Sequence, residues 1–147
     1  MSNGRGAAGG ASSDIVEYRL PGGWDVLVGR TAAANDRLSL RLARSGDLWF
    51  HIRGMPGSHV ILRVPPGAVP DRKTEELAAA IAAYHSKART AGTVAVSCTE
   101  ARHVSKPRGA SPGSVTIRRE RVLKVQPITD VLLRSFPAGS ASPDGES

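Results

Sequence analysis

The stretch from Asp47 to Val64, D-L-W-F-H-I-R-G-M-P-G-S-H-V-I-L-R-V, constrains the fold more than any other part of the chain. Two apolar runs of β-forming residues flank Gly-Met-Pro-Gly, a composition typical of a hairpin with a tight connection. Successive side chains of a strand point to opposite faces, so Leu48, Phe50 and Ile52 share one face. We therefore expect a central β-hairpin with these three residues in the core.

The opposite face of the first run carries polar and aromatic side chains, namely Asp47, Trp49, His51 and Arg53. Such groups can stack on a flat ring or donate hydrogen bonds to an oxyanion. A loop of four residues would pair Arg53 with Ser58. A loop of three or five residues would instead set His51 beside His59, because a slip of one residue reverses every side chain. The sequence leaves both registers open.

Turn and capping signals predict a single α+β domain, with a mainly antiparallel sheet, one long helix packed across it and a shorter helical element. Strands are expected at residues 15–20, 24–30, 37–42, 93–98, 115–118 and 122–125, the last two paired with each other. A short helical turn is expected at 31–36 and the long helix at 72–90, with Asp71 as N-cap and Gly92 as the stop. Ala79, Ala82 and Ala83 indicate either a helix covered on both sides or simply high helix propensity.

The division of the chain follows from composition. Residues 1–13 and 137–147 are expected to be disordered tails, 14–127 the folded domain, and 128–136 a short docking helix. The only cysteine, Cys98, excludes an intramolecular disulfide and a cysteine-rich zinc site. Because there is no signal-peptide core and no run of transmembrane length, we expect a cytoplasmic protein with no membrane partner.

The charge of the chain indicates a polyanionic partner. It has 20 Lys and Arg against 13 Asp and Glu, a formal net charge of +7. A domain this basic attracts nucleic acid or the anionic surface of a ribosome. Trp49, His51 and Arg53 can stack unpaired bases and hold the adjoining phosphate, although a tryptophan is often simply core. The loop at residues 106–113 carries two cations, although a solvated loop explains them equally well. Lys87 and Arg89, next to His85, would extend the basic surface, although a solvated helix end is the commoner explanation.

A catalytic interpretation is the rival. His51 and His59 would form a two-histidine metal or acid-base site, and Ser58 next to His59 suggests a nucleophile. The chain has no H-E-x-x-H string, no G-x-S-x-G string and no evident acid to orient a base. We therefore expect no catalysis, no cofactor and no metal site. A small His-dependent hydrolase or metal-dependent nuclease remains the alternative.

Several strings resemble one known family in order along the chain. They are G-W-D-V-L-V-G-R at 23–30 with Asn35-Asp36 after it, D-L-W-F-H-x-R-x-x-P-G-S-H-V-I at 47–61, A-A-Y-H-S-K-A-R at 82–89 and K-P-R-G-A-S-P-G at 106–113. Together they resemble the NFACT-R domain, the RNA-binding module of the ribosome-quality-control NFACT proteins, over roughly residues 15–127. Gly54 departs from the charged residue that relatives usually carry. The resemblance implies an RNA-binding module that acts in translation on transfer RNA or ribosomal RNA, without catalysis.

The expected RNA contacts combine the motif residues with the basic ones: Trp49, His51, Arg53, Ser58, His59, Arg63, Lys87, Lys106 and Arg108. The expected partners are tRNA or rRNA and the large ribosomal subunit. The other NFACT domains are absent from this sequence, so we expect a stand-alone module that acts either alone or with a protein partner supplying them. A protein-binding adaptor acting through residues 128–136 is a further alternative.

Overall fold

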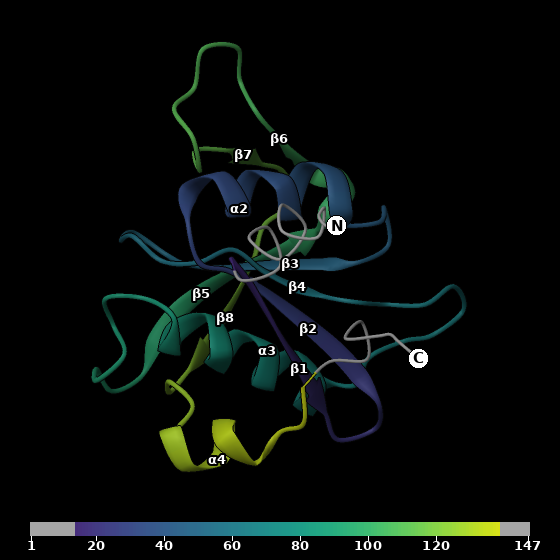
Figure 1. Cartoon of the computed structure of the whole chain (residues 1–147), viewed down its shortest axis with the longest axis vertical. Helices are drawn as coiled ribbons and strands as arrows, with labels where there is room; N and C mark the ends of the chain where they lie inside the picture. Colours follow the sequence, from purple (N-terminus) through teal and green to yellow (C-terminus); the bar gives the residue numbers. More distant parts are fainter. Residues whose placement is uncertain (1–13, 139–147) are drawn as a thin grey trace, which may run out of the picture.

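The structure, a computed structural model, describes residues 14–138, which form a six-stranded sheet with helices on both faces (Figure 1). The sheet contains β1 (Ile15–Leu20), β2 (Trp24–Gly29), β3 (Leu48–Ile52), β4 (Val60–Leu62), β5 (Val94–Glu100) and β8 (Arg121–Val125), in the order β1-β2-β4-β3-β5-β8. All its neighbouring strands are antiparallel. The other elements are α2 (Ala32–Arg37), the π-helix η1 (Leu38–Leu42), α3 (Arg72–Tyr84), the 3-10 helix η2 (Ala101–His103), α4 (Asp130–Ser135) and a small ladder of β6 (Val104–Ser105) and β7 (Thr116–Ile117). The expected α+β class is confirmed.

The two faces of the sheet enter separate cores. Phe50 and Ile52 on β3 pack with Ile81 of α3 in the larger core. Trp49, on the same strand, points the other way and packs with Leu38 of η1 in the smaller one. In Figure 1, α3 and α4 lie on one side of the sheet and α2 with β6 and β7 on the other. The alternation predicted for β3 is confirmed, but both of its faces are buried rather than one.

The central hairpin adopts the register that brings its histidines together. Phe50 of β3 pairs with Val60 of β4, so the same register sets His51 opposite His59. The centroids of the two imidazole rings are 5.5 Å apart, with one ring edge-on to the other. The alternative with a four-residue loop, which pairs Arg53 with Ser58, is not the one present.

The strand expected at residues 37–42 is wrong, because this segment continues the helix that begins after Thr31. The Thr31 hydroxyl accepts a hydrogen bond from the Ala34 amide and caps α2. Helical spacing then buries Leu38 against the sheet, while Leu40 and Leu42 stay exposed. The alternation of leucines is compatible with a strand. The segment is helical instead, because it continues a capped helix and only Leu38 of the three leucines is buried against the sheet.

The long helix is shorter than expected. Asp71 caps α3 as predicted, but α3 ends at Tyr84 rather than near residue 90. The hairpin loop pairs with the residues that follow, since the amide of Ser58 donates to the carbonyl of His85 at 2.9 Å and Gly57 forms a β-bridge with Ser86. Because the backbone of residues 85 and 86 pairs with the hairpin loop, it cannot continue the hydrogen bonds of the helix, and Lys87 therefore lies outside α3.

Both sides of α3 are covered, which decides between the two explanations of its alanines. Ala79, Ala82 and Ala83 are fully buried. The sheet covers one side, and on the other the Ile128 amide donates to the carbonyl of Ala80 at 3.1 Å. The small side chains therefore allow close approach on two sides rather than merely favouring a helix.

The C-terminal part of the domain differs from the expected pairing. The strands expected at 115–118 and 122–125 do not pair with each other: β7 pairs with β6, and β8 pairs with β5. A helix does form within 128–136, and beyond it Pro137 and Ala138 pair with β1 rather than belonging to a tail. The rest of the two expected tails, 1–13 and 139–147, lies outside the described residues. Within residues 14–138, no helix is long and apolar enough to cross a membrane.

Candidate nucleic-acid interface

Trp49 is part of the smaller core and is only 3% exposed. Its indole N–H donates to the hydroxyl oxygen of Ser39 at 3.0 Å, and its ring stacks beside that of His51. A base has no access to this ring. The prediction that Trp49 stacks on RNA is therefore wrong, because η1 covers the face that the sequence suggested was open.

His59 is also buried, with 3% of its surface exposed. The Ser39 hydroxyl oxygen, which accepts from Trp49, is also hydrogen-bonded to His59 Nδ1, 2.8 Å away. Burial, together with the nearby His51, lowers the pKa of His59 to about 4. Burial likewise lowers the pKa of His51. Both imidazoles are neutral at pH 7, and direct RNA contact by His59 is wrong for the same reason as for Trp49.

The two arginines of the hairpin differ in their freedom. Arg63 donates to the Asp47 carboxylate at 3.1 Å, and that carboxylate is 1% exposed and also accepts from the amide of Val64. This arginine holds the hairpin together. Arg53 forms a solvent-exposed ion pair with Glu120 at 3.1 Å. A pair so exposed contributes little, so Arg53 remains available to a phosphate.

Lys106 braces the basic loop at residues 106–114. Its ammonium group contacts the Asp36 carboxylate at 3.1 Å and the carbonyls of Ser111 and Ser114 at 2.7 and 3.0 Å. The amide of Gly113 donates to the same carboxylate. All three donors of Lys106 are thereby used within the protein. Arg108 lies exposed at the tip of this loop, and no described carboxylate pairs with it.

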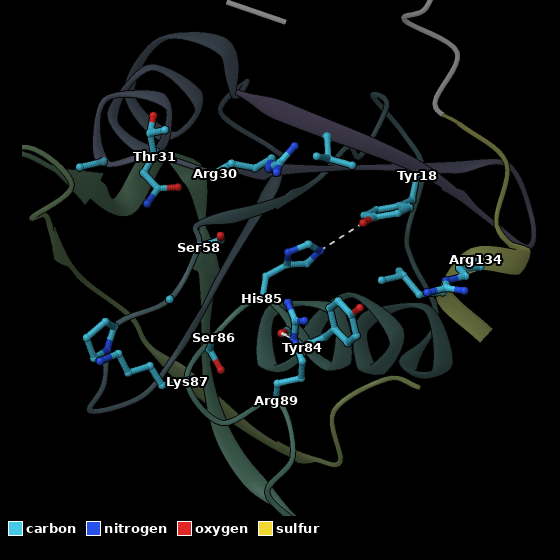
Figure 2. A pocket seen from close by; sticks show the side chains of 16 residues that line it. Tyr18, Arg30, Thr31, Ser58, Tyr84, His85, Ser86, Lys87, Arg89 and Arg134 are labelled. Carbon is cyan, nitrogen blue, oxygen red and sulfur yellow. Dashed lines mark hydrogen bonds between the residues drawn. The ribbon is translucent and has the colours of Figure 1, made fainter. Parts of the chain in front are cut away.

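A cleft of about 830 Å³ brings together two of the expected RNA contacts, Ser58 and Lys87, with side chains outside that set. Its four cations are Arg30, Lys87, Arg89 and Arg134. They come from the end of β2, the segment after α3, and α4, and Figure 2 shows them around the central His85. No Asp or Glu lines the cleft. The result is a concave site of one sign of charge, which concentrates anions.

Neutral aromatic groups lie among these cations. The Tyr18 hydroxyl is hydrogen-bonded to His85 Nε2 at 3.1 Å (Figure 2). Burial, together with Arg89 and Arg30, lowers the pKa of His85 to about 4. The guanidinium of Arg89 lies 4.0 Å from the ring centroid of Tyr84 and donates to the Tyr84 carbonyl at 2.9 Å. Arg89 is thus held in place by an aromatic ring and a carbonyl rather than by a carboxylate.

The cleft contains residues that are not among the expected RNA contacts, although Arg89 and His85 were expected beside Lys87 on the basic surface. Arg30 ends the string G-W-D-V-L-V-G-R, and Tyr84, His85 and Arg89 lie in A-A-Y-H-S-K-A-R, so the motifs contained a signal for them. Arg134 had none, because only the packing of α4 brings it to the cleft. The wall of the cleft needs Gly57, where an added Cβ would lie 2.8 Å from Ile52 Cγ2 and 2.9 Å from Ser86 Cβ.

The histidine pair has little support for a metal site. Among residues 14–138, no three or more His, Cys, Asp or Glu side chains are grouped so as to hold a metal ion. The Ser39 and His59 side chains are hydrogen-bonded like a nucleophile and its base, but both are buried. The Cys98 thiol is buried too, and burial raises its pKa to about 12.

Fold and cleft together define a small basic α+β domain with a concave cationic site, a class suited to binding nucleic acid. The family model described as NFACT protein RNA binding domain matches residues 17–119. The chain belongs to this family of RNA-binding domains, as the resemblance indicated.

The most informative relatives are much longer proteins. The chain is 40% identical over 120 residues to the "Rqc2 homolog RqcH" of Bacillus subtilis, covering 82% of this chain and 20% of the relative. It is 42% identical over 105 residues to the protein of that name from Streptococcus suis, covering 71% and 19%. The chain thus spans about a fifth of the length of these curated relatives.

A solved structure shares the fold. It is the C-terminal part of the fibronectin/fibrinogen-binding protein from Streptococcus suis, with a TM-score of 0.76 and 38% identity. The match covers 82% of this chain and 48% of that one.

Proposed function

We propose that this chain binds tRNA or rRNA without catalysis, in the cytoplasm and in the setting of ribosome quality control. Phosphates would contact the cationic cleft first, with Arg53 and Arg108 as further contacts outside it. The large ribosomal subunit and a further protein of ribosome quality control are the proposed partners. Family membership and the names of the relatives support this setting.

One observation carries the proposal. Four cationic side chains line a single cleft, and no acidic side chain lines it with them. Elsewhere in the described residues many cations are neutralised by carboxylates, as Lys106 is by Asp36 and Arg63 by Asp47. Cations left without such partners gain most from binding phosphate, because no internal ion pair has to be broken first.

The test is the salt dependence of RNA binding. Each phosphate neutralised on a single strand contributes roughly 0.7 to the log-log slope of affinity against salt. The double variant Arg30→Gln/Lys87→Gln should therefore lower the slope by about one to two units. The matched control Lys73→Gln/Lys124→Gln removes the same charge from exposed positions outside the cleft and should leave the slope nearly unchanged.

Two outcomes would contradict the proposal. Equal slopes for both double variants would show that RNA binds elsewhere on the protein. Metal-dependent cleavage of the RNA that is lost in His59→Ala would favour the nuclease alternative instead. Comparing transfer RNA with a ribosomal RNA fragment of equal length identifies the preferred class.

A further inference from the structure

The cationic cleft is broadly open to solvent rather than enclosed. Its volume of about 830 Å³ is large enough to hold a nucleotide. Its walls come from the hairpin loop at Gly57 and Ser58, the segment after α3, and α4. An open cleft alone accepts several kinds of polyanion. The combination of cations and aromatic rings in this one favours a nucleotide turned out of a helix.

One part of the cleft suits a phosphate. Within the described residues, Arg30, Lys87 and Arg134 form no ion pair. The Ser58 hydroxyl has no partner among these residues, and the Thr31 hydroxyl only accepts, from Ala34, so its proton is free to be donated. Guanidinium and hydroxyl donors together match the acceptor oxygens of a phosphate.

The other part suits a base. The rings of Tyr84 and His85 lie 5.1 Å apart edge-to-face, and the ring of Tyr18 lies 6.1 Å from that of His85. These side chains meet at the middle of the cleft (Figure 2). RNA-binding domains commonly stack unpaired bases on such rings and on arginine planes. The hydrogen-bonded Tyr18 and His85, both uncharged, add polar groups that can contact a base edge.

We propose that the cationic cleft binds one unpaired nucleotide of an RNA strand, with its phosphate at Arg30, Lys87 and Ser58 and its base against Tyr84 and His85. This site rests on the proposed function, that the chain binds RNA. It goes further by assigning the cleft to a nucleotide outside the double helix rather than to the duplex backbone.

The experiment compares two hairpin RNAs of equal length and charge, one fully paired and one with a single unpaired nucleotide, by fluorescence anisotropy on the full chain. Stacking of one base predicts that the unpaired RNA binds about tenfold more tightly. Arg30→Gln/Lys87→Gln should remove most of that preference. Lys73→Gln/Lys124→Gln, with the same loss of charge outside the cleft, should change the affinity for both RNAs little and equally, and so keep the preference. All four substituted side chains are exposed and lie outside the core, so we expect both double variants to keep the fold.

Three results would overturn the site. Equal affinity for the two RNAs removes the nucleotide site but leaves RNA binding intact. Loss of the preference in the control pair as well removes the cleft as its location. The labelled RNA can also be displaced with two competitors, adenosine 5′-monophosphate and the unlabelled hairpin. If the mononucleotide displaced it at the lower concentration, the cleft would be a site for a free nucleotide. Failure to bind either RNA contradicts the proposed function itself.

Discussion

Gly29 is the residue at which β2 meets α2 most closely. A Cβ added there would lie 2.2 Å from the side-chain oxygen of Asn35, and that oxygen accepts the amide proton of His59 at 3.0 Å. The contact ties the second strand, the helix after it and the hairpin together. Any side chain at position 29 must push Asn35 away and leave the buried amide of His59 without a partner.

Gly29→Ala should therefore lower the free energy of unfolding by about 1–3 kcal/mol, the usual cost of overpacking. Gly46→Ala is the matched control, because a Cβ at position 46 meets nothing within 4 Å. Urea denaturation of both variants provides the measurement. An equal loss in the two would mean that the close approach to Asn35 carries no energy.

His59 predicts how stability responds to acid. Its folded pKa of about 4 lies below the ordinary value of 6.5, so the unfolded chain binds a proton more readily. Above pH 6.5 the buried His59 costs the folded state nothing. As the pH drops towards 4, protonation of the unfolded chain lowers the free energy of unfolding, by roughly 3 kcal/mol at most from this residue.

Urea denaturation between pH 7 and 4.5 checks this effect. His59→Gln should show a shallower loss of stability than the wild type, whatever its stability at pH 7. Ser39→Ala removes the hydrogen-bond partner of His59 but keeps the imidazole, so its pH dependence should stay close to that of the wild type. An unaltered slope in His59→Gln would show that another group dominates the acid response.

Side-chain chemistry at the residue level was only partly readable from the sequence. The alternation along β3 correctly separates Phe50 from Trp49, because a strand has a strict period of two. It could not show that Trp49 is buried, since burial depends on a helix 10 residues away in the chain whose conformation the leucine pattern misrepresents. Lys106 appeared to be a free cation, and only the fold brings Asp36 to it.

At the scale of elements, α4 closes the side of α3 that faces away from the sheet. Leu133 is 6% exposed and packs in the larger core, whereas Val131, two residues earlier, is 82% exposed. Local pattern predicted a helix here but not which face is used. The end of α3 shows the same limit, because the hairpin loop that takes its backbone groups is distant in sequence.

Leu133→Ala should destabilise the domain by about 2 kcal/mol or more, as for other buried leucines. Val131→Ala should change stability little, because its side chain is already in solvent. Thermal denaturation of the two variants gives the comparison. If Val131→Ala proved the more damaging, α4 would have to pack with its opposite face.

At the scale of the whole molecule, the cleft exists only when separate parts of the chain are folded together. Arg30, Ser58, Lys87 and Arg134 are far apart in sequence and meet through the sheet order and the packing of α4. A ligand of the cleft therefore binds the folded state alone. The fold class could be predicted from strand and cap signals, but a site assembled in this way could not.

RNA should consequently raise the melting temperature. At 100 times its Kd it would stabilise the fold by about 2.7 kcal/mol. The gain should shrink in high salt, where phosphate contacts weaken. Differential scanning fluorimetry at two salt concentrations checks both statements, and the Arg30→Gln/Lys87→Gln protein serves as the comparison. A gain in melting temperature that is independent of salt would contradict binding through the cationic cleft.

The pairing of Pro137 and Ala138 with β1 also affects how copies of the chain behave towards one another. It occupies the first edge of the sheet, where a free strand would invite a second molecule to add on. At the opposite edge, β8 carries the exposed Lys124, and a lysine on an edge strand disfavours the addition of another strand. The domain thus resists aggregation by different means at its two borders, a proline-containing cover at one and a charged lysine at the other.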